Sequence, residues 1–190
     1  ATTACQPERA ELEVRTEVAN AAATAADVVI ETELLDARGR RVGAAKQAAT
    51  VPAGGTWAGT SEMVVTKPQL WSPEQPRLHR AVTRLWSGGR LLDETVTTFG
   101  IRTVRVSAER GFELNGRSLK LYGGNVHHDN GPLGAAAFAR AEERKVELLK
   151  AAGFNAVRTA HNPPSTAFLE ACDRLGLLVM NELYDGWEKA

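Results

Sequence analysis

The stretch Arg158-Thr159-Ala160-His161-Asn162 directly follows a short apolar run, and two further polar clusters in the chain are placed in the same way. These are Asn125-Val126-His127-His128-Asp129 and Asn181-Glu182-Leu183-Tyr184-Asp185-Gly186-Trp187. Sequence with helical periodicity separates the three clusters. A strand, a polar loop and a helix, repeated, is how a (β/α)8 TIM barrel builds an active site at the carboxyl ends of its strands. The pattern predicts the first three strands and two helices of such a barrel.

The segments between the clusters indicate where these elements lie. Apolar residues recur at helical spacing over 138–152, and Gly153 follows as a stop signal. A second helix opens at Asn162-Pro163-Pro164-Ser165, with Asn162 as its expected cap, and ends at Gly176. The expected barrel strands cover 118–122, 154–158 and 177–180.

The order βαβαβ fits either a TIM barrel or an open doubly wound sheet. A nucleotide-binding sheet would carry a Gly-rich phosphate turn after its first strand. Here Gly123-Gly124-Asn125 neither matches that fingerprint nor leads directly into a helix. Histidines and carboxylates at successive strand ends suit a polyhydroxyl ligand, because a neutral imidazole both donates and accepts hydrogen bonds. These observations favour the barrel.

The first half of the chain has the period of β-strands. Charged and apolar residues alternate from Glu11 to Val18, which is typical of a half-buried strand. Similar runs between turn residues predict further strands at 28–34, 41–51, 56–66, 78–86 and 90–99. Six or seven short strands without a helix fit an immunoglobulin-like β-sandwich. We therefore expect a sandwich over 1–104 and a truncated TIM barrel over 105–190, opening with a hairpin that turns at Asn115-Gly116.

Composition excludes several classes of function. The formal net charge is zero and 24% of residues are charged, so nucleic acid is not an expected partner. No apolar run is long enough for a membrane span, which predicts a soluble protein with no membrane partner. Cys5, near an end expected to be frayed, and Cys172 are read as free thiols, and no metal or cofactor motif is present. The compartment, cytoplasmic or secreted, stays open.

One irregular stretch in the first half is rigid, because Pro73 and Pro76 each fix a backbone angle. It contains Trp71. The expected role of this indole is to plug one end of the sandwich, since buried tryptophans usually serve packing. Stacking on a sugar is the alternative.

Several ordered motifs together point to a known family. They are Phe112-Glu113-Leu114-Asn115-Gly116, Gly124-Asn125-Val126-His127, Asn155-Ala156-Val157-Arg158-Thr159-Ala160-His161-Asn162-Pro163-Pro164 and Cys172-Asp173-Arg174-Leu175-Gly176-Leu177. With Leu70-Trp71-Ser72-Pro73-Glu74 and Phe99-Gly100-Ile101-Arg102, the chain resembles the β-galactosidase branch of glycoside hydrolase family 2 from about Glu11 onward.

This resemblance implies roles for residues of the first two clusters. His127 and His161 match histidines that hydrogen-bond the sugar at the non-reducing end. Arg158 matches an arginine that supports the nucleophilic carboxylate. Asn125 and Asp129 are expected to shape the same pocket. The alternatives are a structural arginine paired with the acidic residue of the third cluster, and histidines satisfied within the core.

The third cluster is expected to bind substrate without supplying a catalytic group. Glu182 matches an acidic position outside the catalytic pair, and Trp187 could stack on a sugar. In the family the acid/base glutamate follows the fourth strand and the nucleophile follows the seventh, so we expect no catalytic residue in this chain. Family galactosidases can also bind magnesium through a Glu-x-His motif, and Gly186-Trp187-Glu188 does not match it.

The leading hypothesis is a fragment of a retaining exo-β-glycosidase. A TIM barrel takes roughly 250 residues, and the second half offers 86, from Arg105 to Ala190. Its uncovered sheet edges would favour self-association. A β-galactoside is the preferred substrate on the stretch His161-Asn162-Pro163-Pro164. The alternatives are a non-catalytic carbohydrate-binding or scaffold protein with a degenerate half-barrel, and an enzyme that uses Glu182 as its base.

Overall fold

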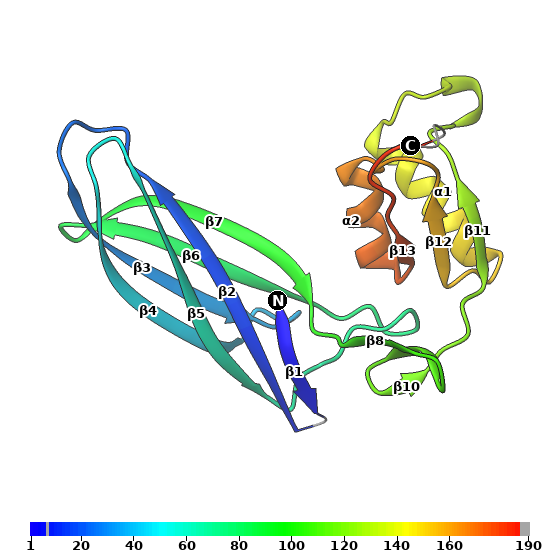
Figure 1. The fold of residues 1–190 in the computed structure, drawn as a ribbon, viewed down its shortest axis with the longest axis horizontal. Helices are drawn as coiled ribbons and strands as arrows, with labels where there is room; N and C mark the ends of the chain where they lie inside the picture. The colour runs from blue at the N-terminus through cyan, green and yellow to red at the C-terminus, as the bar shows by residue number, and fades with distance from the viewer. Residues whose placement is uncertain (7, 187–190) are drawn as a thin grey trace. The chain divides into compact units, whose positions relative to one another are not determined.

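The computed structural model of the protein describes residues 1–6 and 8–186 (Figure 1). Contacts along the chain group it into two compact units. The first unit comprises Ala1–Leu70 and Arg77–Thr103, and the second comprises Trp71–Pro76 and Val104–Ala190. The chain therefore contributes the short segment Trp71–Pro76 to the second unit, returns to the first unit at Arg77, and enters the second unit again at Val104.

The first unit is a sandwich of two antiparallel sheets. One sheet has the strand order β1-β2-β5 and the other β4-β3-β6-β7 (Figure 1). Their bounds are β1 Thr2–Gln6, β2 Arg9–Ala19, β3 Ala26–Leu35, β4 Arg41–Val51, β5 Thr56–Thr66, β6 Leu78–Ser87 and β7 Arg90–Gly100. The immunoglobulin-like fold is confirmed, and the six strands expected after residue 10 are all present. The expectation of a frayed start is wrong, because β1 pairs antiparallel with β2, with Cys5 opposite Ala10.

Strand alternation fills the centre of this sandwich. Leu12 of β2 lies opposite Met63 of β5, and both are buried with Leu34 of β3. A second cluster joins Val28 and Ile30 to residues of the neighbouring strands. Apolar residues two apart along a strand thus share one face and bury it, as the period-two pattern predicts.

The second unit begins with a small antiparallel sheet. It consists of β8 Val104–Ser107, β9 Gly111–Leu114 and β10 Arg117–Ser118, in the order β10-β9-β8. The turn between β9 and β10 is Asn115-Gly116, with φ of 53° and 75°. These left-handed angles are those of a two-residue hairpin turn, so the predicted hairpin is confirmed.

Three parallel strands and two helices follow. The elements are β11 Gly123–Val126, the short 3₁₀ turn η1 Gly131–Leu133, α1 Ala139–Ala151, β12 Ala156–Thr159, α2 Thr166–Leu175 and β13 Leu178–Met180. The strands lie in the order β11-β12-β13, as expected for the first three strands of a TIM barrel (Figure 1). Residues of α1, α2 and the strands form one buried cluster, made of Val146, Val157, Phe168, Ala171, Cys172 and Leu177.

The position expected for the first barrel strand is wrong. Sequence placed it at 118–122 and took Gly123 and Gly124 as its end, whereas β11 starts at Gly123. A Cβ atom on Gly123 would lie 1.8 Å from the carbonyl oxygen of Ala156 on β12. Glycine is needed there for close approach of two backbones rather than for a turn.

The start of the second barrel helix also differs from the expectation. Asn162 does not cap α2. Instead, the Ser165 hydroxyl accepts a hydrogen bond of 3.1 Å from the Phe168 amide. The helix ends at Gly176 in the left-handed conformation, as predicted.

The segment Trp71–Pro76 belongs to the second unit. The Trp71 side chain is buried, with 1% of the residue exposed, and its Nε1 donates to the Asp173 carbonyl at 2.7 Å. Asn115 Nδ2 donates to the Trp71 carbonyl at 3.0 Å, and Lys150 Nζ donates to the Pro73 carbonyl at 3.0 Å. The indole thus serves packing as a residue of the second unit, and its burial leaves no face for a sugar.

The two cysteines are free, as expected. Burial raises the pKa of the Cys172 thiol to about 12, which leaves it a small apolar core residue. Within the described residues, no helix has both the length and the apolar character that crossing a membrane requires.

Candidate functional site

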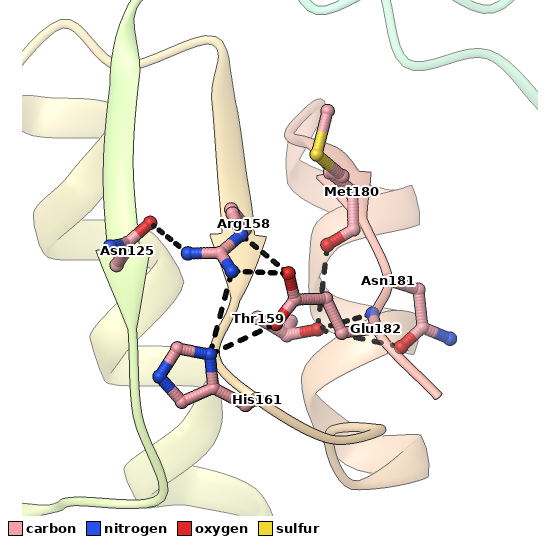
Figure 2. A network of polar contacts seen from close by, with 7 residues as sticks. All are labelled: Asn125, Arg158, Thr159, His161, Met180, Asn181 and Glu182. Atoms are coloured by element: carbon pink, nitrogen blue, oxygen red, sulfur yellow. Dashed lines mark hydrogen bonds and ion pairs between the residues drawn. The ribbon is translucent and has the colours of Figure 1, made fainter. Parts of the chain in front are cut away.

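Four polar side chains from successive parts of the barrel meet at the carboxyl ends of its strands (Figure 2). Asn125 lies on β11 and Arg158 on β12, directly opposite each other in the strand register. His161 lies in the loop after β12, and Glu182 follows β13. Because the strands are parallel and in register, residues at equivalent strand ends are brought to one edge.

The centre of this group is the ion pair between Arg158 and Glu182. Both Nε and Nη2 of the guanidinium lie 2.5 Å from Oε1 of the carboxylate. The remaining guanidinium nitrogen, Nη1, donates to Asn125 Oδ1 at 3.3 Å. Arg158 is thus held from two neighbouring strands, and its positive charge is matched by one negative charge.

His161 completes the network from the loop after β12. Its Nδ1 lies 3.2 Å from Oε2 of Glu182 and 3.4 Å from Nη2 of Arg158 (Figure 2). When Nδ1 carries the proton it donates to Glu182, and this hydrogen bond selects the tautomer of the ring. The carboxylate of Glu182 therefore fixes the orientation of the imidazole.

A buried threonine fixes the segment that carries Glu182. The amide of Glu182 donates to Thr159 Oγ1 at 3.2 Å, and this hydroxyl lies 3.4 Å from the carbonyl oxygen of Met180. Thr159 is only 3% exposed. Sequence reasoning missed this role, although a single hydroxyl within an apolar strand end was a usable signal.

The other predicted residues of the first cluster lie in the loop after β11. The His127 ring makes an edge contact with His161, with 5.7 Å between centroids, so His127 adjoins the network. Asp129 does not: its Oδ1 accepts from the Gly131 amide at 2.9 Å and shapes the turn. His128 is exposed, and the prediction for Trp187 lies outside the described residues.

The network borders an open hollow of about 450 Å³. Its lining consists of Arg158, His161 and Glu182 together with the segment 183–186. Among the described residues, no group of three or more histidine, cysteine, aspartate or glutamate side chains is arranged to hold a metal ion.

This combination of sandwich and barrel start is matched by known sequences. The sequence model of glycosyl hydrolases family 2 covers residues 1–102, and the model of that family's TIM barrel domain covers residues 104–185. The chain belongs to glycosyl hydrolases family 2. The resemblance seen in its motifs is therefore confirmed for the family.

Individual members of glycosyl hydrolases family 2 show the same relationship. Beta-galactosidase BoGH2A of Bacteroides ovatus is 38% identical over 188 residues, which is 99% of this chain and 22% of that protein. A putative beta-glucuronidase of Formosa agariphila is 44% identical over 128 residues, covering 67% of this chain and 12% of that protein. The chain thus spans about a fifth or less of these relatives.

Solved structures of the family agree with this fold. A family 2 member from Bacteroides cellulosilyticus has a TM-score of 0.95 and 46% identity, over 98% of this chain and 26% of that one. The Bacteroides uniformis beta-glucuronidase has a TM-score of 0.90 and 35% identity, over 96% of this chain and 22% of that one. Of these two structures, only the second is named for a sugar specificity, that of a beta-glucuronidase.

Sequence reasoning also missed a charged pair behind the site, on α1. Glu142 is only 3% exposed, and Lys145 lies one turn further along the helix. The missed signal was spacing, because Glu142 stands four residues before the buried Val146 and therefore falls on the same helix face.

Proposed function

We propose that this chain is the immunoglobulin-like sandwich and the first barrel segment of a retaining exo-β-glycosidase, and that it supplies one wall of the sugar pocket. The observation that carries the proposal is the network of Asn125, Arg158, His161 and Glu182 at the carboxyl ends of three barrel strands. This is where TIM barrel enzymes place their active sites. Membership of glycosyl hydrolases family 2 supports the same reaction class.

The chemistry expected of these groups is binding and orientation. His161 and the adjoining His127 offer ring nitrogens that can donate to or accept from sugar hydroxyls. Arg158 supplies a fixed positive charge at the strand ends, where we expect it to support the nucleophilic carboxylate of the complete barrel. Asp129 is proposed to contribute only through the shape of its loop.

The catalytic pair is not part of this proposal. Retaining glycosidases need two carboxyl groups about 5 Å apart, one as nucleophile and one as acid/base. In this network Glu182 is the only carboxylate, and its Oε1 already accepts a hydrogen bond from Arg158 Nε and forms an ion pair with Nη2. A carboxylate held in this way is poorly placed to attack a sugar or to remove a proton. We propose that both catalytic glutamates lie in later strands of a complete barrel.

The proposed substrate is a β-galactoside. The relative aligned over 99% of this chain is named a beta-galactosidase. The motif His161-Asn162-Pro163-Pro164 gives the same preference. Relatives named beta-glucuronidase make a β-glucuronide the competing substrate.

Chromogenic substrates test this function. A gene product that extends this chain through a complete barrel is expected to hydrolyse p-nitrophenyl β-galactoside faster than the β-glucuronide, and the 190-residue chain is expected to hydrolyse neither. Faster hydrolysis of the β-glucuronide would make a β-glucuronide, and not a β-galactoside, the assigned substrate. Turnover by the 190-residue chain that disappears in Glu182→Gln would instead make Glu182 a catalytic base.

A further inference from the structure

A buried ion pair lies on the side of α1 that faces the loop after β11. The side chains of Glu142 and Lys145 are 4% and 18% exposed, and their Oε1 and Nζ atoms lie 3.4 Å apart. Taking two charges out of water costs several kcal/mol per ion, and an apolar pair of similar volume is often at least as stable. The pair therefore invites a role other than stabilising the helix.

The contacts of the pair identify what it holds. Glu142 Oε1 accepts a hydrogen bond of 2.8 Å from Asn130 Nδ2, and Lys145 Nζ donates to the His127 carbonyl at 3.3 Å. Asn130 also closes the loop on itself, because its Nδ2 donates to the Ala136 carbonyl at 3.2 Å. The Glu142 carboxylate thus holds the loop 127–136 against α1 in two ways, directly through Asn130 and indirectly through Lys145.

The loop fixed in this way carries a residue of the proposed pocket. The His127 ring lies edge-on to His161, which is itself bound to Glu182. Lys145 Nζ also lies 5.8 Å from the centroid of the Phe168 ring, beneath the same loop. Removing Glu142 would leave the partly buried Lys145 without its counter-ion, so the ammonium would be drawn toward water.

We propose that Glu142, acting through Lys145 and Asn130, is a positioning residue that sets where His127 stands in the sugar pocket. This inference rests on the proposed function for its purpose. The contacts of Glu142 with Lys145 and Asn130, which together form what we call the clamp, do not depend on that function. The two can therefore be tested separately.

Amide hydrogen exchange of the 190-residue chain tests the clamp. In Glu142→Ala the amides of 127–136 are expected to exchange at least about tenfold faster, the change expected from loss of hydrogen bonds to a charged group. Exchange in β12 and α2 should stay within about twofold of the original chain. Glu142→Gln should restore part of the protection, because its amide oxygen can still accept from Asn130.

The matched control is Glu147→Gln on the same helix, where the carboxylate is 42% exposed and pairs with Arg140. This substitution should leave the exchange rates of the amides of 127–136 unchanged. If Glu142→Ala does not fold, Asn130→Ala replaces it, since this change removes the hydrogen bond between the loop and Glu142 and leaves Glu142 paired with Lys145. Loop exchange that is unaltered in a folded clamp variant, or equally altered in the control, would overturn the proposal.

The link to the pocket is tested with D-galactose as the probe, by following the histidine ring nitrogens by NMR. In the original chain the rings of His127 and His161 should both shift. In Glu142→Ala only the His161 ring should respond at the same galactose concentration. Equal responses of the His127 and His161 rings in Glu142→Ala would overturn the proposal that Glu142 positions His127. If neither ring responds in the original chain, the sugar-binding proposal fails, while the exchange experiment still decides whether the clamp exists.

Discussion

At the residue scale, the site is organised around one carboxylate. Glu182 contacts Arg158 with one oxygen and His161 with the other, so a single side chain fixes the orientation of both (Figure 2). Its own position depends on Thr159, which accepts a hydrogen bond from its backbone amide. Arg158 and Thr159 lie on β12, His161 lies in the loop after it, and Glu182 follows β13. The arrangement therefore exists only when these two strands are paired in register.

A double-mutant cycle measures the coupling at this pair. The single changes Arg158→Met and Glu182→Gln and their combination should show a coupling free energy of about 1 to 2 kcal/mol in urea unfolding, because the geometry is close but both groups are partly exposed. The exposed pair Arg9 and Glu11, 3.1 Å apart, is the control and should couple more weakly. Equal coupling in the two pairs would contradict a special role for the site pair.

A buried histidine in the first unit should make stability depend on pH. His79 is 2% exposed and its Nδ1 has no hydrogen-bonding partner among the described residues. Burial lowers its pKa from 6.5, and the charge of Asp36 opposes this in part. The folded state therefore binds fewer protons than the unfolded state below pH 6.5, and stability falls as the pH drops from there toward the lowered pKa.

The measurement is urea unfolding at intervals between pH 7.5 and 5, for the original chain and for His79→Gln. Replacing His79 should flatten the decline on the acid side of about pH 6.5. Exposed His128→Gln should leave the slope unchanged. The same slope in all three proteins would place the acid sensitivity at another group.

At the scale of elements, a side-chain hydrogen bond marks the start of α2. Ser165 starts α2, and Gly176 ends it in a left-handed conformation. Asn162, three residues before Ser165, has a type of side chain that also caps helices. Sequence reasoning named only Asn162 as the cap and did not identify Ser165, which lies on the other side of the proline pair. The structure selects the residue whose oxygen reaches the Phe168 amide.

A pair of substitutions tests this assignment. Ser165→Ala should lower the free energy of unfolding by about 1 kcal/mol, the usual cost of losing a cap. Asn162→Ala should change it by less than about 0.5 kcal/mol, as at an ordinary surface site. Circular dichroism during urea unfolding measures both. Equal losses would mean that Asn162 also holds the start of the helix.

The Trp71–Pro76 segment gives a second test at this scale. Trp71→Phe keeps most of the buried ring and removes the 2.7 Å hydrogen bond to the Asp173 carbonyl. That carbonyl loses a buried donor, so a destabilisation of about 1 to 3 kcal/mol is expected. Amide exchange should show it in α2 and not in the strands of the sandwich. Trp57→Phe, within the first unit, should show the opposite distribution.

For the whole molecule, sequence predicts regular elements well and close backbone approach poorly. The bounds of β4 and β5 follow directly from alternation between turn residues. The start of β11 does not, because Gly123 looks like a turn until Ala156 is known to lie beside it. Strand β1 was missed for a related reason. Nothing in its short sequence indicates that it pairs with β2, and only the structure reveals this.

The candidate site residues could be predicted where a sequence motif marked the end of a strand. Asn125, Arg158, His161 and Glu182 do meet. Asp129 turned out to shape its own loop, and Glu142 was not found because a charged side chain on a buried helix face is easily read as solvent-exposed. Sequence thus located the edge of the sheet and could not resolve which loop residues turn toward it.

The placement of Trp71–Pro76 has a consequence for how such proteins can be recombined. The second unit contains these six residues, which lie some thirty positions before Val104 along the chain. A crossover in a gene near codon 104 would join one parent's indole and prolines to another parent's helix and hairpin, where Asp173, Asn115 and Lys150 must accommodate them. Exchange of the sandwich between relatives should therefore succeed most often when this short insert is inherited together with the barrel.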